Sequence, residues 1–400
     1  MRLSSSTIFN QGAASISAQQ SDLFKTQRQM ASGLRMAAPA DDPVAASAVL
    51  RTGQALAFTA QHAANQGSAM ATLVQAESAT GAIGDVLQDA RQLLLSSVNG
   101  AYADSDRRAI ATELAGRLAQ LAGMANTRDG AGAYLFAGFN DTAPPFALTA
   151  TGAIYSGDDG IRELQVGAQR RIAVSANGAD MLMRIPSGNG VFAVSAAPAN
   201  TGEGVIDPGR VTNPAALTGH QYQLVFSSAV AYDVLDVTAG TTVSSGNVYS
   251  SGTAITVAGM QTALAGQPAA GDRFNLDPSV HQSVFATLSS AIAALNAPAP
   301  TGAGRAAIAN QVSRAVTGLD RAFDQVLTTR TSLGTRLSEI DILKTVTSAA
   351  DNDQQRRLSE LQDLDYAKAT TDFSRQKTTL EANQQTFAQL SKLSLFDFLR

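Results

Sequence analysis

The two ends of the chain carry matching seven-residue repeats, and no other sequence feature constrains the fold as strongly. Near the N-terminus, steps alternating between three and four residues connect Ala13, Ile16, Gln20, Leu23, Gln27, Met30 and Leu34. Near the C-terminus, the same spacing connects Tyr366, Ala369, Phe373, Gln376, Leu380, Asn383, Phe387 and Leu390. In both segments one row of the repeat is apolar and the other is partly polar. This spacing is typical of helices that pack as a left-handed coiled coil.

If only one of these repeats were present, the simpler interpretation would be an amphipathic helix that packs against its own local core and not a coiled coil. Two matched repeats at opposite ends instead favour long helices from the two termini that pack on each other. The sequence therefore predicts a mainly α protein with a β-rich insert. Its long antiparallel helical rod, or coiled coil, is built from both chain ends, and a β domain is inserted between them.

Further helical repeats lie inside these ends. One run continues through Val49, Leu56, Ala63, Met70, Leu73, Ala76, Thr80, Ile83, Leu87, Ala90 and Leu94. A second contains Ile308, Val312, Val316, Leu319, Phe323, Val326, Leu333, Leu337 and Ile340. We expect residues 1–45 and 355–400 to form a terminal coiled-coil assembly domain, and residues 46–142 and 276–354 to form a helical rod domain.

Residues 143–275 are expected to form the inserted β-rich domain. Apolar and polar residues alternate there with a period near two, and glycines punctuate the short runs. Gln221 to Phe226, Tyr232 to Val237 and Ile255 to Val257 are expected strands. Helix is expected to resume at Asp277 as N-cap, with Pro278 at the first helical position.

The composition excludes several kinds of site and partner. The chain has no cysteine, so disulfides and metal sites with thiolate ligands are impossible. It has only three histidines, so few residues could supply imidazole ligands to a metal. The formal net charge of −4 argues against nucleic acid as the main partner. No run approaches the roughly 18–20 apolar residues that span a bilayer, and no secretory signal is indicated at the N-terminus.

Motifs for chemistry are weak. Gly302, Gly304 and Ala307 follow a proline-rich linker instead of a strand, so a helix start is the simpler interpretation. Asp351, Asn352 and Asp353 resemble the opening of a calcium loop but lie in a helical pattern. Asp158 and Asp159 are most simply part of a turn between strands. The three histidines, His62, His220 and His281, each stand alone, so no catalytic, metal-binding or cofactor-binding residue is nominated, and no cofactor is expected.

The chain ends also resemble a known family. Residues 1–11 and Ala31-Ser32-Gly33-Leu34-Arg35 are similar to the start of bacterial flagellin-like proteins. Tyr134 to Gly138 and Arg330 to Gly334 resemble other stretches of the same family. Pro39-Ala40-Asp41-Asp42-Pro43-Val44-Ala45-Ala46 resembles the members at the hook–filament junction, since filament flagellins usually lack the second proline. Leu364 to Ala369, Leu380-Glu381-Ala382 and Leu393 to Leu399 are similar to the C-terminus of the same members.

This resemblance implies a secreted structural subunit, exported through the flagellar type III apparatus, with no catalytic activity. It would join the hook, through the first hook-associated protein, to the flagellin filament. Self-association in a tubular junction and an export chaperone are further expectations. The residues expected to serve assembly are Ile16, Leu23, Met30, Leu34, Tyr366, Phe373, Leu380, Phe387, Leu390, Leu395, Phe396 and Phe398.

Three other functions stay open at this point. The nearest is filament flagellin itself. A secreted adhesin or effector with a helical stalk would instead use the β-rich insert to bind a ligand. An enzyme built on the insert is the least favoured, because no constellation of residues there nominates a nucleophile or an acid–base pair.

Overall fold

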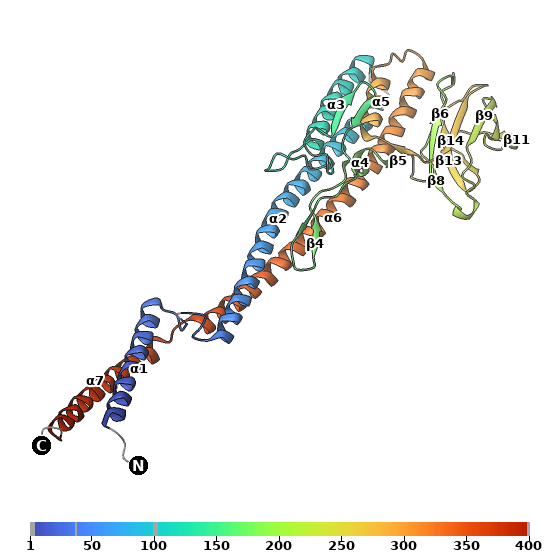
Figure 1. Ribbon diagram of the computed structural model, residues 1–400. Coiled ribbons are helices and arrows are strands. Elements are labelled where there is room, and N and C mark those ends of the chain that lie inside the picture. The colour runs from blue at the N-terminus through green and yellow to red at the C-terminus, as the bar shows by residue number, and fades with distance from the viewer. Residues whose placement is uncertain (1–4, 37, 99–102, 398–400) are drawn as a thin grey trace. The chain divides into compact units, whose positions relative to one another are not determined.

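A computed structural model describes residues 5–36, 38–98 and 103–397 (Figure 1). The chain forms two compact units. The terminal unit contains residues 1–64 and 343–400, and the central unit contains residues 65–342.

The helices confirm the mainly α fold class. They are α1 (Ser5–Ser32), α2 (Pro43–Ser97), α3 (Asp104–Ala125), α4 (Gly178–Leu182), α5 (Val284–Asn296), α6 (Gly302–Gln362) and α7 (Tyr366–Asp397), with a 3-10 turn at Pro214–Ala216. In the terminal unit α1 and α7 lie side by side (Figure 1), as expected for helices from the two chain ends.

The strands lie between α3 and α5, which confirms the inserted β-rich region. Preceding α4 are β1 (Phe146–Thr149), β2 (Gly152–Tyr155), β3 (Glu163–Gln165) and β4 (Arg171–Ala173). After it come β5 (Ile185–Pro186), β6 (Phe192–Ala196), β7 (Val205–Ile206), β8 (Arg210–Val211), β9 (Tyr222–Ser228), β10 (Ala231–Asp236), β11 (Thr241–Val248), β12 (Ala254–Val257), β13 (Met260–Ala265), β14 (Arg273–Pro278) and β15 (His281–Gln282).

The helical core of the central unit follows the expected periodicity. The residues from Leu73 to Leu94 in the first predicted run are no more than 1% exposed. Gly84 on α2 faces Phe323 on α6, since a Cβ at Gly84 would be in van der Waals contact with that ring at 3.5 Å. The Arg330 guanidinium on α6 also donates to Glu77 on α2 at 2.7 Å. Apolar residues recurring every three or four positions thus place one face of each long helix against the other.

Two short hairpins pack directly on these helices. In the first, β1–β2, Phe146 exchanges two hydrogen bonds with the Asn126 side chain, which follows α3, and its ring lies 5.4 Å from that of Phe285 on α5. The second, β3–β4, accepts a 2.7 Å hydrogen bond from Gln66 of α2 at the Val166 carbonyl. The insert is therefore anchored to the helices before its larger β part begins.

Residues 187–280, here called the β domain, have a core of their own. An antiparallel five-stranded sheet has the order β11-β10-β9-β14-β6, and a smaller sheet has the order β12-β13-β7, with β8 also paired to β13. Phe226 and Phe274 are almost fully buried between them. The Phe226 ring contacts those of Tyr249 and Phe274 at 5.2 and 5.8 Å between centroids, both edge-on.

Side chains of α6 hold the β domain by its backbone. Asn310 accepts from the Ile206 N–H and donates to the Gly204 carbonyl, both at 2.9 Å. Arg321 donates to the Asn189 carbonyl at 2.7 Å. These bonds satisfy backbone groups at the edge of the domain, so it is fixed to α6 by more than the chain connections.

The expected restart of helix at Asp277 is wrong. Asp277 and Pro278 continue β14, where they pair with Ala193 and Phe192 of β6, and helix resumes only at Val284, capped by the Ser283 hydroxyl. Pro278 is tolerated because the pairing of β14 with β9 ends at Leu276, so the missing N–H interrupts no hydrogen bond to that strand.

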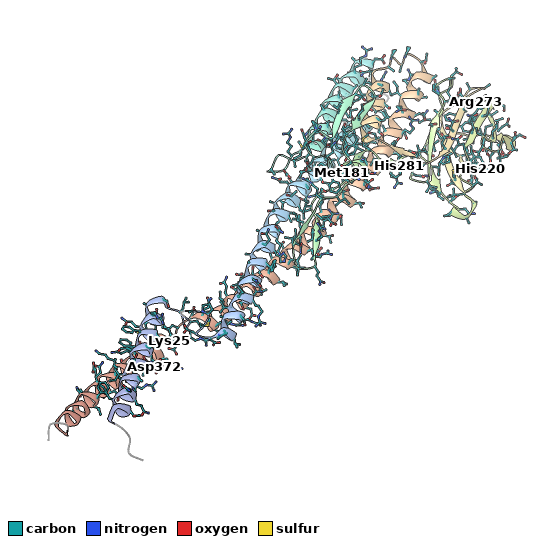
Figure 2. The ribbon with its side chains drawn as sticks, viewed as in Figure 1. Lys25, Met181, His220, Arg273, His281 and Asp372 are labelled. Carbon is teal, nitrogen blue, oxygen red and sulfur yellow. The ribbon has the colours of Figure 1, made fainter. Side chains whose placement is uncertain are left out.

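The β domain contains an imidazole–carboxylate pair. His220, labelled in Figure 2, lies with Nδ1 2.7 Å from Asp236 Oδ2. This hydrogen bond, followed by that from the Ala239 N–H, holds the pKa of Asp236 below its usual value. A carboxyl whose pKa is depressed by folding stabilises the protein above its unfolded pKa, and this stabilisation is lost as the pH falls through the folded pKa.

We therefore expect the urea midpoint of the central unit to fall as the pH is lowered below about 4, near the ordinary pKa of an aspartate. Part of that fall should be absent in an Asp236→Asn variant, which is neutral at every pH. Urea titrations followed by circular dichroism between pH 3 and 6 would measure it. An identical pH dependence in both proteins would contradict this role of Asp236.

Candidate assembly surface

The paired terminal helices run antiparallel. Phe387 of α7 lies against the start of α1, with its ring centroid 4.9 Å from that of Phe9. In the second half of α1, the Thr26 hydroxyl donates to the Gln376 side-chain oxygen at 2.9 Å. At the other end the Tyr366 hydroxyl donates to the Met30 carbonyl at 3.3 Å. Lys25 on α1 and Asp372 on α7, labelled in Figure 2, lie in the half of the pair nearer Tyr366.

The C-terminal repeat lies at this contact as expected. Ala369 and Leu380 are buried, and Phe373, Gln376, Asn383 and Phe387 are partly buried. Tyr366, at the start of the helix, keeps 54% of its surface exposed although its hydroxyl reaches α1. Leu390, Leu395 and Phe396 belong to α7, but their side chains lie outside the described residues, as does all of Phe398.

The N-terminal repeat is correct in one row and wrong in the other. Ile16, Leu23 and Met30 are partly buried as expected. The second expected row, which consists of Ala13, Gln20, Gln27 and Leu34, is exposed. Its place is taken by the residues one position earlier, Gly12, Gln19, Thr26 and Gly33, which are partly or fully buried.

The physical reason for this correction lies on α7. A Cβ on Gly12 would lie 2.7 Å from the Phe387 ring, so the ring occupies the space that a side chain would need. Thr26 is buried because Gln376 satisfies its hydroxyl. Neither glycine nor threonine counts as apolar in a search for hydrophobic rows, and their partners lie more than three hundred positions away in the sequence.

Aspartates organise the ends of the helices in the terminal unit. Asp42 caps α2 by accepting from the Ala45 N–H at 2.9 Å, and Pro43 takes the first helical position. Asp41 accepts from the Ala38 N–H and pairs with Lys25 at 3.1 Å. Asp365 caps α7 by accepting from the Lys368 N–H at 3.0 Å. The acidic motifs that carried the family resemblance therefore have a local structural role.

The two helix breaks also pair with each other. The Arg35 N–H donates to the Gln362 carbonyl at 2.7 Å, and the Leu364 N–H donates to the Gly33 carbonyl at 3.0 Å. Together they form an isolated antiparallel bridge between Leu34 and Asp363. Leu34 thus contributes its backbone to the unit, while its side chain is 39% exposed.

Large apolar side chains remain exposed on the terminal unit. The most exposed are Val44, Phe58, Leu50, Phe24, Val346, Tyr366 and Phe9, between 78% and 52% exposed. Four of them are aromatic, although aromatic residues make up only 6% of the chain. Sequence reasoning missed Phe24 and Phe58 because it looked for residues that share one helix face, and these two lie off it. Exposed aromatic residues in such numbers are typical of protein-binding surfaces.

The carboxylates considered for ion binding are engaged by protein donors. Asp158, between β2 and β3, accepts from the Phe139 and Gly160 N–H groups at 2.8 and 2.7 Å, and these bonds lower its pKa. Asp159 pairs with Arg184 at 2.8 Å, which lowers the pKa of Asp159. Asp353 lies within α6 and pairs with Arg357.

In the part of the chain that the structure describes, no three acidic or imidazole side chains are placed to hold a metal ion. Gly302, from the weak nucleotide-like match, is the first residue of α6. Over the same described residues, no helix has the length and hydropathy needed to cross a membrane.

Comparison with known proteins identifies both ends of the chain. The model of the bacterial flagellin N-terminal helical region matches residues 4–141, and that of the flagellin C-terminal helical region matches residues 304–399. Flagellar hook-associated protein 3 of Escherichia coli strain K12 is 27% identical over 397 residues, which are 99% of either chain.

Solved structures extend the similarity to the insert. FlgL of Xanthomonas campestris, in a crystal of space group H3, is 31% identical and has a TM-score of 0.69, with 74% of this chain and 99% of that chain covered. The flagellar junction protein FlgL of Legionella pneumophila is 27% identical with a TM-score of 0.70, and the match covers 80% of this chain and all of that one. Because 80% of this chain is covered, the structural similarity is not confined to the two regions that the family models match.

Proposed function

The chain belongs to the flagellar hook-associated protein 3 family of flagellin-like proteins, and from this premise we propose that it is the structural subunit that joins hook and filament by polymerising through its terminal helices. The role is structural and lies in the bacterial flagellum, at the hook–filament junction. One observation carries the proposed mode of assembly: the terminal unit exposes aromatic and aliphatic side chains on helices whose own contact is thinly packed.

The thin contact favours burial by neighbours. Among the described side chains of α1, only Thr26 is buried, and on α7 only Ala369 and Leu380 are. Apolar surface that stays in water in the free chain can be covered by identical surfaces in a closed ring or tube of subunits. Self-association of the terminal unit therefore accounts for both its exposed aromatic side chains and its sparse internal core.

The proposed partners follow from a location at the hook–filament junction. We propose the first hook-associated protein on the hook side and flagellin on the filament side, with an export chaperone for the chain before assembly. Residues 1–45 and 355–400 would form the assembly domain, residues 46–142 and 276–354 the helical rod, and residues 143–275 the insert. Members of this family are structural flagellar proteins, and we propose that this chain likewise catalyses no reaction.

A double substitution tests the assembly surface. Phe24 and Phe58 are 62% and 66% exposed, so Phe24→Ser with Phe58→Ser should leave the folded chain and its export unchanged. Incorporation at the hook tip should fall about tenfold or more, since truncating an interface aromatic typically costs more than about 1 kcal/mol. Quantitative immunoblotting of isolated hook–filament junctions measures it.

The matched control is Val248→Ser on the exposed strand β11. Val248 is 85% exposed but belongs to the β domain, so its replacement should leave incorporation unchanged. Equal incorporation of the wild type and the double variant would show that the two phenylalanines contribute nothing to assembly.

A further inference from the structure

The hydrophobic repeat alone leaves the register of the terminal helix pair undecided. Phe373, Leu380 and Phe387 recur at intervals of seven on α7, and Ile16, Leu23 and Met30 do so on α1. A slip of one heptad would again place apolar rows against apolar rows. Such a slip moves one helix about 10 Å along the other, given a rise of about 1.5 Å per residue. Some other feature must therefore select a single register.

Two glycines supply that feature. Gly12 leaves room for the Phe387 ring, whose Cδ2 would be 2.7 Å from a Cβ at this position. Gly33, at the other end, ends the helix with a φ of +73°, a conformation that favours glycine, and a Cβ there would also lie 3.2 Å from the Tyr366 hydroxyl. Gly12 lies within α1, and Gly33 follows the last residue of α1 three heptads later; the two aromatic residues lie three heptads apart on α7. Each end of the contact thus pairs an aromatic side chain with a glycine.

A one-heptad slip would lose both fits. Phe387 would then face Gln19, whose side chain fills the space that Gly12 leaves open, and Gly33 would face Phe373 in place of Tyr366. The polar pair between Thr26 and Gln376 discriminates less, because Asn383 would bring another side-chain amide to Thr26. The glycine–aromatic pairs therefore carry most of the selection.

We propose that Gly12 with Phe387 and Gly33 with Tyr366 fix the register of the terminal helices, and so fix where Phe24 and the other exposed apolar side chains stand for neighbouring subunits. This inference rests on the proposed assembly through the terminal unit. These four residues would have a positioning role. They would fix how α1 and α7 align, and this alignment would determine where the exposed apolar side chains lie.

A compensating pair of substitutions tests the fit. Gly12→Leu should reduce incorporation at the junction about tenfold or more, because overpacking of this size typically shifts a two-state equilibrium by that factor. Adding Phe387→Ala to Gly12→Leu removes the ring that the leucine meets, and should restore incorporation to within about threefold of the wild type. Gly116→Leu is the matched control, because this glycine lies on α3 in the central unit and has nothing within 4 Å of its Cβ position.

Introduced cysteines read the register directly, because the natural chain has none. Ile16→Cys with Asn383→Cys should form a disulfide when isolated flagella are treated with a mild oxidant, since each position lies four residues from the Gly12–Phe387 contact in an antiparallel pair. Leu23→Cys with Asn383→Cys should not, because they meet only after a slip of one heptad. Two cysteines whose Cα atoms lie beyond about 7 Å cannot be bridged.

Rescue by Phe387→Ala, together with cross-linking of the first pair alone, would support the proposal. The proposal would be overturned if the Gly12→Leu variant were incorporated as well as the wild type, or if Phe387→Ala failed to restore incorporation. Equal cross-linking of both cysteine pairs would also overturn it. In each of these cases the wild-type chain would still be found at the junction. Absence of the wild-type chain from the junction would instead reject the proposed function.

Discussion

In the free chain, backbone amides of residues 5–32 and 366–397 should exchange with solvent at least about a hundredfold faster than those of residues 75–97 and 104–125. The reason is the difference in burial between the two units. Helix α1 has one buried residue among its described side chains. On α2, by contrast, all seven residues of the predicted repeat between Leu73 and Leu94 are almost completely buried. Helices in proteins gain most of their stability from such tertiary packing, so thinly packed helices open often.

Hydrogen exchange on dilute monomer, read by mass spectrometry, would measure this difference. The same measurement on isolated flagella is the control, because contacts with neighbours should slow exchange in the terminal helices. Similar protection of both regions in the monomer would contradict the expectation, and would mean that the terminal helices are ordered before assembly.

The second large effect concerns the core of the β domain. Phe274 is completely buried and touches Phe226 edge-on, so Phe274→Ala leaves a cavity between the two sheets. Removing a buried phenylalanine side chain typically costs about 3–5 kcal/mol of unfolding free energy. We expect a loss of this size in urea titrations followed by circular dichroism.

The control for this loss is Val248→Ala, whose side chain is 85% exposed, and which should change the unfolding free energy by less than about 0.5 kcal/mol. A loss below about 1 kcal/mol for Phe274→Ala would contradict the packing described for this core, because only an exposed or loosely packed ring would cost so little.

The sequence predicted the long helices well because their burial follows the helical period. Leu73, Ile83, Leu87 and Leu94 are buried as the spacing requires, and so is Leu380 in the C-terminal repeat. These positions depend on the local pattern of apolar residues, which a single sequence contains. The strands near residues 222, 232 and 255 were also found from their alternation.

The errors arose where a distant partner decides the outcome. Gly12 is buried by Phe387, and no local pattern at Gly12 reveals that ring. Asp277 and Pro278 resemble a helix start, but pairing with β6 extends β14 through both residues. The strand order of the β domain likewise depends on pairings between β14 and β6, which are separated by most of the domain.

The proposed assembly surface could be predicted from the sequence only in part. The contact between α1 and α7 follows from the repeats, but Phe24 and Phe58 stand outside them and became visible only once their exposure was known. Both side chains are exposed in the isolated unit, so neither the helical period nor local core packing predicts an apolar residue at these positions. Exposed apolar side chains of this kind are explained if a neighbouring subunit covers them.

The position of the subunit on intact flagella tests the central claim most directly. A peptide tag inserted at Gly240, in the exposed turn between β10 and β11 where nothing lies within 4 Å of the Cβ position, would leave both helix pairs untouched. Immunogold labelling should give a single narrow band at the boundary between hook and filament. Gold along the whole filament, or on the surface of cells that lack a hook, would contradict the junction role.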